Sequence, residues 1–397
     1  MRLLFILLFL YYLLTMLYPS GDDAVSGQRI YPQVTMAVCA LLCLYCTLKN
    51  HRQILQEKLF RPFFAMVILA LVYVLYPFGT ASELYAQFLF FLKSYMAIVF
   101  MFTVYVLLSK AQGQTGKLIY SIYALQLLYA FYQLWYDRQN MLMNDHEIFD
   151  SNSGFTLVCL IPMALMLPIR RLRFYICVLV LMGCIYSGQR SAALAAVLSI
   201  PFCLSSLRGS IKRSDVLLMV LAVIFVLFPI LQEAIANIQM RNEIDATNDS
   251  VGSGRSVFWK LVWDDFWNGN AMQIFFGHGT NTVPELLGRT FGMSIGAHNG
   301  WLDMLYSFGL VGISLYVSMI WGLFKHNKRF SRLNSGRKNI LLIIFIVFTV
   351  KCSTSHGYWD ITVMPLSLAI AVVAAEANRR RTLPHSAPIK NTVQTSD

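Results

Sequence analysis

Residues 86–109 read AQFLFFLKSYMAIVFMFTVYVLLS, and this stretch decides the fold. Its single charged residue is Lys93, and its length meets the roughly 20 residues that a helix needs to cross a bilayer. Across the 397 residues of the chain, 57% are apolar and 13% are charged. A soluble domain carries about a quarter charged residues, so this composition excludes a soluble enzyme, a disulfide scaffold and a disordered chain. We therefore expect an integral membrane protein.

Comparable apolar stretches recur along the chain and predict an all-α, polytopic membrane protein with about twelve transmembrane helices. The segments are 3–19, 33–48, 62–79, 86–109, 118–136, 153–169, 174–189, 191–206, 215–232, 300–323, 340–356 and 358–376. The first resembles a signal peptide in position, but its apolar run is long and no small-x-small cleavage site follows, so an uncleaved span is expected. Residues 1–376 then form one transmembrane domain, and the polar tail 377–397 is expected to be disordered.

The distribution of charge orients these segments. If the N-terminus is cytoplasmic, the cytoplasmic segments hold 23 of the 32 Lys and Arg residues but four of the 20 acidic residues. This asymmetry follows the positive-inside rule, so the net charge of +12 reflects topology and does not point to a nucleic-acid partner. Both termini are therefore predicted to be cytoplasmic.

One connector, residues 233–299, is much longer than the others and lies on the outer side. It keeps many large apolar residues, so we expect it to be folded. Within it, residues 255–267 (RSVFWKLVWDDFW) place a set of apolar side chains on one broad helical arc: Val257, Phe258, Leu261, Trp263 and Trp267. Such a helix either lies in the membrane interface on the outer side or caps the helical bundle, and the sequence leaves both arrangements open.

Ionisable residues near membrane depth are candidate functional residues, because a charge in hydrocarbon is costly unless it is paired or hydrated. Arg190 stands in the corner CIYSGQRSAALAAVL (184–198), where the chain turns at the outer face. It either ties this corner to the interface or binds an anion in an outward-facing cavity, a task that suits a guanidinium. Lys93 either lines the same cavity or extends its ammonium to the surface, and Lys351 is expected to do the latter.

The outer connector adds further cations, Arg241, Arg255, Lys260 and Arg289. With Arg190 they could form a ring around an anion-binding cavity. The same connector also holds Glu243, Asp245, Asp249, Asp264 and Asp265, so surface ion pairs are the alternative for each arginine.

A histidine stands where this connector meets the helix predicted from residue 300. A neutral imidazole at the membrane boundary, here His298, can act as a general base near neutral pH, although a residue at this position can also simply cap the helix. Asn299 follows it directly. Asp303, five positions later, lies about 140° around the helix and is expected to be a poor orienting partner for His298.

Several of these elements together resemble the bacterial O-antigen polymerase and O-antigen ligase superfamily. They are the Ser-x-x-Arg corner Ser187 to Arg190, the segment Gly254-Arg255 with Trp259, the turn Gly277-His278-Gly279, and Ala297-His298-Asn299 with Leu302, which lead into a helix with Gly309 and Gly312. Their order and their common placement on the outer face carry the resemblance, which extends over residues 150–325.

The resemblance implies a GT-C-type bundle in the bacterial inner membrane, with a periplasmic active site that acts on undecaprenyl-diphosphate-linked glycans. It implies that Arg190 and Arg255 hold the lipid diphosphate and that His298 deprotonates the acceptor hydroxyl, with inversion at the anomeric carbon. Further candidate substrate-binding residues are Arg241, Arg289, Lys93 and Asn299. Because arginines can neutralise the leaving diphosphate, neither a metal ion nor another cofactor is expected. Expected partners are the lipid-linked oligosaccharide, membrane lipids, a flippase and a chain-length regulator.

Three functions fit this resemblance to different degrees. Polymerases of this type are associated with Arg-x10-Gly patterns, which Arg241 and Arg289 satisfy, although both lie in one loop here. Ligases, which transfer the glycan to lipid A-core, are associated with His-x10-Gly, which His298 and Gly309 satisfy. A flippase would be expected to show internal repeats, and the sequence has none that is visible. A polymerase is therefore the leading prediction and a ligase the alternative.

Overall fold

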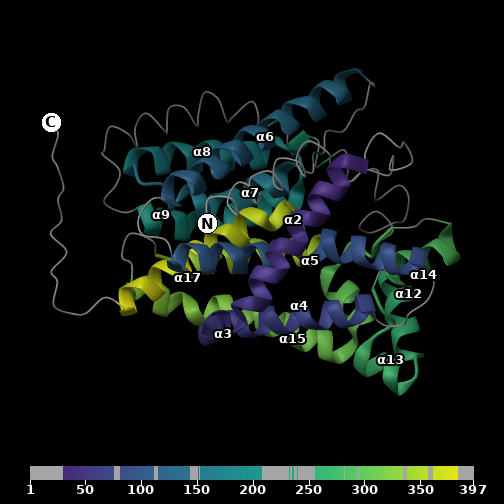
Figure 1. The fold of residues 1–397 in the computed structure, drawn as a ribbon. Coiled ribbons are helices and arrows are strands. Elements are labelled where there is room, and N and C mark those ends of the chain that lie inside the picture. The colour runs from purple at the N-terminus through teal and green to yellow at the C-terminus, as the bar shows by residue number, and fades with distance from the viewer. Residues whose placement is uncertain are drawn as a thin grey trace, which may run out of the picture.

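The computed structural model describes residues 30–75, 81–110, 115–143, 151, 153–207, 255–280, 282–292, 295–333, 338–355 and 361–382, with a few single residues between 232 and 239. Every regular element in this described part of the chain is a helix, as the sequence predicted. The arrangement of these helices is shown in Figure 1.

Ten of the twelve predicted segments overlap a described helix. These helices are α2 (Ile30–Lys49), α4 (Arg61–Leu75), α5 (Ala81–Lys110), α6 (Thr115–Met143), α7 (Ser153–Ala164), α8 (Arg170–Tyr186), α9 (Arg190–Leu207), α15 (Gly300–Leu333), α16 (Ile340–Thr354) and α17 (Met364–Thr382). The segment 3–19 and nearly all of 215–232 lie outside the described residues. By length and composition, three helical stretches are sufficient to cross a membrane, namely Lys58–Leu75, Arg190–Leu207 and Gly300–Arg332.

Short helices connect or cover these longer ones. They are α3 (His51–Gln56), the 3-10 turns η2 (Lys58–Phe60) and η5 (Ile361–Val363), and, in the outer connector, α12 (Arg255–Trp267), α13 (Ala271–Phe276) and α14 (Thr282–Phe291). Figure 1 shows α12, α13 and α14 together at one end of the molecule, here called the outer end. The C-terminal end of α17 points to the opposite, inner end.

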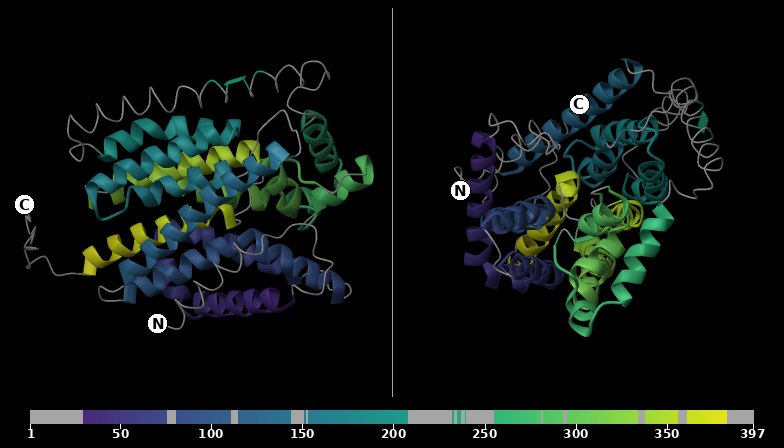
Figure 2. Two further views of the ribbon diagram at one scale, coloured as in Figure 1. Left: turned by 90° about the horizontal axis from the view of Figure 1, so that it is seen from above. Right: turned by 90° about the vertical axis from the view of Figure 1, so that its right-hand side faces the viewer.

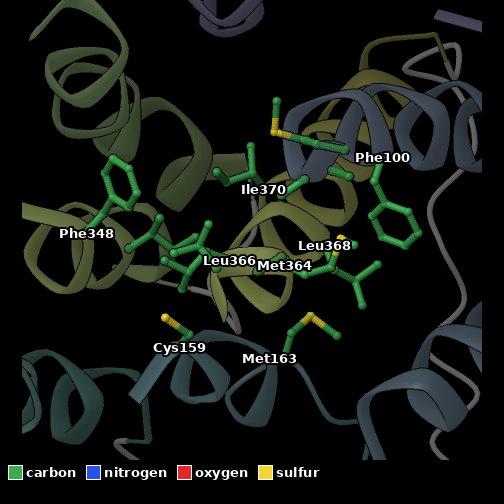
Figure 3. Packing of buried hydrophobic residues seen from close by; sticks show 14 of the residues in the cluster. Phe100, Cys159, Met163, Phe348, Met364, Leu366, Leu368 and Ile370 are labelled. Atoms are coloured by element: carbon green, nitrogen blue, oxygen red, sulfur yellow. The ribbon is translucent and has the colours of Figure 1, made fainter. Parts of the chain in front are cut away.

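The main core forms around helices that are apolar on every side. Such helices must be buried, and every residue of α7 except Thr156 is buried. The yellow C-terminal helices run between teal α8 and α9 on one side and the purple and blue N-terminal helices on the other (Figure 2). Figure 3 shows the centre of this core, where Leu366 and Ile370 of α17 lie among Phe100 of α5, Met163 of α7 and Phe348 of α16.

A second, smaller hydrophobic cluster lies at the outer end. Val262 and Phe266 of α12, Val283 and Leu287 of α14, and Tyr306 of α15 are buried together in it. The bounds of α12 coincide with the predicted segment 255–267, but its burial differs from the predicted arc, because Val257, Trp263 and Trp267 are exposed. Helix α12 therefore caps this cluster with one face and presents two indoles on the other.

At the inner end, a buried carboxylate joins three segments. Glu57 is 2% exposed, and its two oxygens lie 3.2 Å from guanidinium nitrogens of Arg329 in α15 and Arg381 in α17. This contact explains why α17 extends to Thr382, six residues into the tail that was predicted to be disordered from residue 377. The helix ends later than predicted because Arg381 has a fixed partner; residues 383–397 lie outside the described part of the chain.

Candidate functional site

The segment before α15 is held by contacts on both sides of the Ala297 peptide. The indole Nε1 of Trp259 in α12 donates a hydrogen bond of 2.7 Å to the carbonyl oxygen of Ala297. The backbone N–H of Ala297 donates a hydrogen bond of 3.2 Å to Oδ1 of Asp303, whose carboxylate is fully buried. Two side chains from different helices therefore fix the residue that precedes His298.

His298 itself has an unusual backbone conformation. Its φ angle is +52°, in the left-handed region that residues with a Cβ rarely adopt, and such conformations cluster at functional sites. Asn299, the next residue, caps α15: its Oδ1 accepts from the N–H groups of Trp301 and Leu302, at 3.1 and 3.3 Å. The capping role that the sequence left open for His298 therefore belongs to Asn299, and the half-buried imidazole lies at the turn in front of the helix.

The end of α16 lies beside this turn and receives Arg255. The Arg255 guanidinium donates to the carbonyl oxygen of Thr354, the last residue of α16, at 3.2 Å. The last carbonyls of a helix carry partial negative charge, which favours a cation at this position. The indole of Trp301 also donates to Ser353 Oγ, at 3.1 Å, and this bond joins the start of α15 to the end of α16.

The Ser187–Arg190 corner is a tight turn between α8 and α9. Ser187 Oγ donates to the carbonyl of Cys184 at 2.7 Å and accepts from the N–H of Gln189 at 3.3 Å, while Gly188 takes a φ of +69°. A Cβ on Gly154 of α7 would overlap Ser187 Oγ, so glycine is required for this close approach. The turn places Arg190, partly buried, at the first position of α9.

The orientation of α9 brings Arg190 to the same end of the bundle as Arg255. Helices α9 and α16 pack together, and Ser206 Oγ near the end of α9 donates to the carbonyl of Lys338, just before α16 begins. The two helices are therefore antiparallel, and the Arg190 end of α9 faces the Thr354 end of α16. The outer end thus gathers Arg190, Arg255 and His298 from three parts of the sequence.

Lys351 corrects one prediction about this end of the bundle. The sequence favoured an ammonium extended to the surface, but the side chain is 2% exposed. It lies one turn before the end of α16, a helix that packs against α7, α9 and α15. The position of Lys351 near the end of an apolar segment suggested that its side chain reaches water. The neighbouring helices cover the side chain instead.

Helix α15 is broken at Gly309, where φ is +64° and ψ is −162°. The break releases the carbonyls of Tyr306 and Ser307 from the helical pattern, and they accept from the N–H groups of His278 and Gly279 at 2.9 and 3.0 Å. A Cβ on Gly309 would lie 2.5 Å from the backbone of Phe275. The glycines of the Gly277–Gly279 turn and of α15 therefore allow two backbones to touch.

Polar groups line this contact. The imidazole of His278 stacks on the ring of Tyr306, with centroids 4.2 Å apart, and the Tyr306 hydroxyl donates to Asp265 at 2.6 Å. Burial lowers the pKa of His278, while the nearby Asp265 carboxylate opposes this shift. Among the described residues, Nε2 of His278 and the hydroxyls of Thr280 and Ser307 are buried without a hydrogen-bond partner.

The remaining predicted site residues are placed differently. The side chain of Arg289 in α14 is 83% exposed and lies 3.8 Å from Glu285 of the same helix, so it forms a surface ion pair, the alternative that the sequence left open. Arg241 lies outside the described residues, and of Lys93 the structure describes the backbone, within α5, but not the side chain. In the described part of the chain, no group of three or more His, Cys, Asp and Glu side chains is arranged to hold a metal ion.

Two residues at this end have contacts that the sequence did not predict. In the sequence, Trp259 is part of a motif with no role of its own, and the helical angle predicts that Asp303 is a poor orienting partner for His298. In the structure, Trp259 bonds to the carbonyl oxygen of Ala297 and Asp303 to its N–H group. A buried aspartate in the first turn of a membrane helix is costly unless it accepts hydrogen bonds, and that cost was the available signal.

Comparison with known proteins adds one finding. Residues 175–317 match the model of a family described as O-antigen ligase. A search among curated proteins found no match to the chain. The matched region runs from α8 to α15 and includes the Ser187–Arg190 corner, α12 with Arg255, and the His298 turn. The match therefore confirms the resemblance of this chain to the O-antigen ligase and polymerase superfamily.

Proposed function

We propose that the protein is a membrane glycosyltransferase that joins undecaprenyl-diphosphate-linked repeat units into a surface polysaccharide. In this proposal residues 1–376 form one transmembrane domain of about twelve helices and GT-C type, in the bacterial inner membrane. The outer end faces the periplasm, and both termini are cytoplasmic. The charge asymmetry of the sequence supports this orientation.

One observation carries the proposal: the turn that holds His298 is fixed by Trp259 and Asp303 at the end of the bundle where Arg190 and Arg255 also lie. A general base must be held in place to be effective, and the two bonds to Ala297 hold the turn. The strained backbone at His298 is consistent with a functional position.

The proposed chemistry divides the work among these residues. Arg190 and Arg255 bind the diphosphate of the donor lipid and neutralise its charge as the anomeric C–O bond breaks. His298 removes the proton from the acceptor hydroxyl, whose oxygen forms the new bond on the opposite face of the sugar. The lipid diphosphate leaves with the electron pair of the broken bond. Asn299, Lys93, Arg241 and Arg289 are proposed to contact the glycan or the diphosphate, with Arg289 the most peripheral.

A ligase is the second candidate, because the matching family is described as O-antigen ligase and His298 and Gly309 show the associated spacing. A ligase would use the same donor but transfer a finished glycan to lipid A-core. The two candidates differ in what accumulates when the activity is lost.

Gel analysis of the surface glycan in a strain that lacks this protein tests the proposal. Loss of a polymerase leaves lipid A-core with a single repeat unit, or a lipid-linked single unit. Loss of a ligase leaves long glycan on undecaprenyl diphosphate and bare lipid A-core. Unprocessed units retained at the cytoplasmic face would indicate a flippase and contradict the proposal.

Variants then test the named residues. We expect His298→Ala and Arg190→Ala to reduce glycan extension by at least about 100-fold while the protein still accumulates in the membrane. Arg289→Ala should have a smaller effect, because solvent partly replaces an exposed charge. His51→Ala and Arg52→Ala, exposed residues of α3 at the inner end, are matched controls. Near-normal glycan from His298→Ala would rule out the general-base role.

A further inference from the structure

A groove of about 320 Å³ lies between α6 and α8, outside the site described above. This volume is at the lower end of the roughly 300–1,000 Å³ found for small-molecule sites. Its apolar walls are formed by Phe131, Leu134 and Trp135 of α6 and by Leu179, Met182 and Tyr186 of α8. Leu179 is 45% exposed and Trp135 is 57% exposed, so the groove opens on the side of the bundle.

The polar residues of the groove stand at one end of it. Arg138 and Gln139 belong to the last turns of α6, and the Arg138 guanidinium lies 5.8 Å from the centroid of the Tyr186 ring, at the end of α8. The apolar residues of α6 and α8 occupy the turns that precede Arg138 and Tyr186. The groove therefore has an apolar wall and, at Arg138, a cationic end, which matches a lipid with an anionic head and an apolar chain.

The cationic end is joined by hydrogen bonds to the corner that carries Arg190. Ser151 Oγ donates to the carboxylate of Asp137, the neighbour of Arg138. The N–H of the same Ser151 donates to the carbonyl of Ser187, at 2.9 Å, and Ser187 begins the Ser187–Arg190 turn. Tyr186, which faces Arg138, directly precedes Ser187. The end of the groove is thus connected to the proposed donor site through two bonds from one serine.

We infer that this groove binds the second lipid substrate, a polyprenyl diphosphate that carries the acceptor repeat unit, with its phosphate at Arg138 and its chain along α6 and α8. The inference rests on the proposed polymerase function, because joining two lipid-linked units requires two lipid chains to be bound at the outer face together. A guanidinium binds phosphate oxygens through two parallel hydrogen bonds. A groove open to the side admits the chain directly from the bilayer.

Titration of the purified full-length protein with undecaprenyl diphosphate, followed by native mass spectrometry, tests the inference. We expect the wild type to bind two equivalents. Arg138→Gln should weaken one of them by roughly tenfold or more, because it removes a charge-assisted contact. Arg138→Lys should weaken it less, since the charge remains. Leu179→Trp should weaken the same equivalent by filling the groove.

Matched controls exist on α8, one of the two helices that form the groove. Arg171 and Leu172 are also exposed but lie near the inner start of the helix, so Arg171→Gln and Leu172→Trp should bind two equivalents like the wild type. Diacylglycerol tests whether the phosphate is recognised, and phosphatidylglycerol tests whether any anionic lipid is sufficient. Equal retention of either lipid would overturn the inference, since the groove would then bind bulk lipid.

Failure of this inference is separable from failure of the proposed function. The double variant Arg190→Gln/Arg255→Gln should keep the Arg138-dependent equivalent and lose the other. If it loses all binding while Arg138→Gln and Leu179→Trp bind like the wild type, the groove is not a substrate site and the donor site stands. If Arg138→Gln loses one equivalent but deletion of the protein leaves the surface glycan unchanged, the groove binds lipid and the proposed function is wrong.

Discussion

The buried carboxylate of Glu57 at the inner end and the break in α15 at the outer end differ in how their polar groups are paired. At the inner end, the buried carboxylate of Glu57 has one guanidinium for each oxygen, and both lie 3.2 Å away. At the outer end, a helix is broken at Gly309, the backbone of His298 is in the left-handed region, and buried polar atoms of His278 and Ser307 lack partners among the described residues.

We interpret this difference as a division between a structural end and the end that carries the proposed function. A fully paired buried group fixes the arrangement of the elements around it, which suits the junction of Glu57 with α15 and α17. Unpaired buried groups and strained backbone are costly, and proteins keep them mainly at sites where they are used. The outer end, and not the inner one, is therefore where we expect substitutions to change activity as well as stability.

The largest effect on stability is expected at the break in α15. Gly309→Ala places a Cβ 2.5 Å from the backbone of Phe275 and disfavours the φ of +64°, so we expect a loss of about 3 kcal/mol and loss of glycan extension. Gly322→Ala in the same helix is the matched control, because its added Cβ would meet only Leu59, at an ordinary 3.6 Å. Thermal unfolding in detergent measures both, and equal midpoints would show that the break is not required.

A smaller effect, on stability alone, is expected at the inner end. Glu57→Gln leaves Arg329 and Arg381 without their shared carboxylate, and we expect a loss of about 2 kcal/mol, moderated because both arginines are partly exposed. Glycan extension per folded molecule should be unchanged. Adding Arg381→Gln to this variant should restore part of the stability, since one uncompensated charge is removed. A variant as stable as the wild type but inactive would reverse our assignment of the two ends.

The two hydrogen bonds that hold Ala297, from Trp259 and to Asp303, form a clamp on this residue. We expect its loss to reduce activity more than stability. Trp259→Phe removes the hydrogen bond to the Ala297 carbonyl and keeps an aromatic ring, so stability should fall by about 1 kcal/mol. Glycan extension should fall further than this loss of stability explains, because the turn that carries His298 is released. Trp263→Phe, on the exposed face of the same helix, is the control. Equal activity of the two variants would show that the clamp is structural only.

The smallest effect concerns pH. Burial lowers the pKa of His278 below 6.5, so the folded protein binds this proton more weakly than the unfolded chain does. Stability from the neutral imidazole is therefore complete above pH 6.5 and is lost as pH falls below it. Between pH 7.5 and 5, the wild type should therefore lose more stability than His278→Phe, which keeps the stacking on Tyr306. Parallel losses in thermal unfolding would assign the pH dependence to other groups.

The sequence predicted those features that depend on local pattern. Helix α12 has the predicted bounds because its apolar residues follow a helical period, and the overlap of ten predicted segments with helices has the same origin. The corner with Arg190 and the turn with His298 could be chosen as candidate positions from the sequence, because an ionisable residue stands out in an apolar chain.

Features that depend on contacts between distant segments were not predictable in this way. The break at Gly309 exists because the turn at Gly277 docks on it, and a glycine in an apolar helix alone indicates no more than close packing. The burial of Lys351 and the order of α17 as far as Thr382 depend equally on neighbours that are distant in sequence. For Asp303, the helical angle gave no indication of its backbone partner, the N–H of Ala297.

The break in α15 also makes the number of residues between His298 and Gly309 important. The stretch from Gly300 to Phe308 is a rod anchored at one end by the docked turn and at the other by the Asn299 cap. Adding or removing one residue in this rod would rotate its outer end by about 100° and shift it by about 1.5 Å, which turns the imidazole away from its neighbours. The number of residues between His298 and Gly309 therefore fixes the position and the orientation of His298 relative to the bundle.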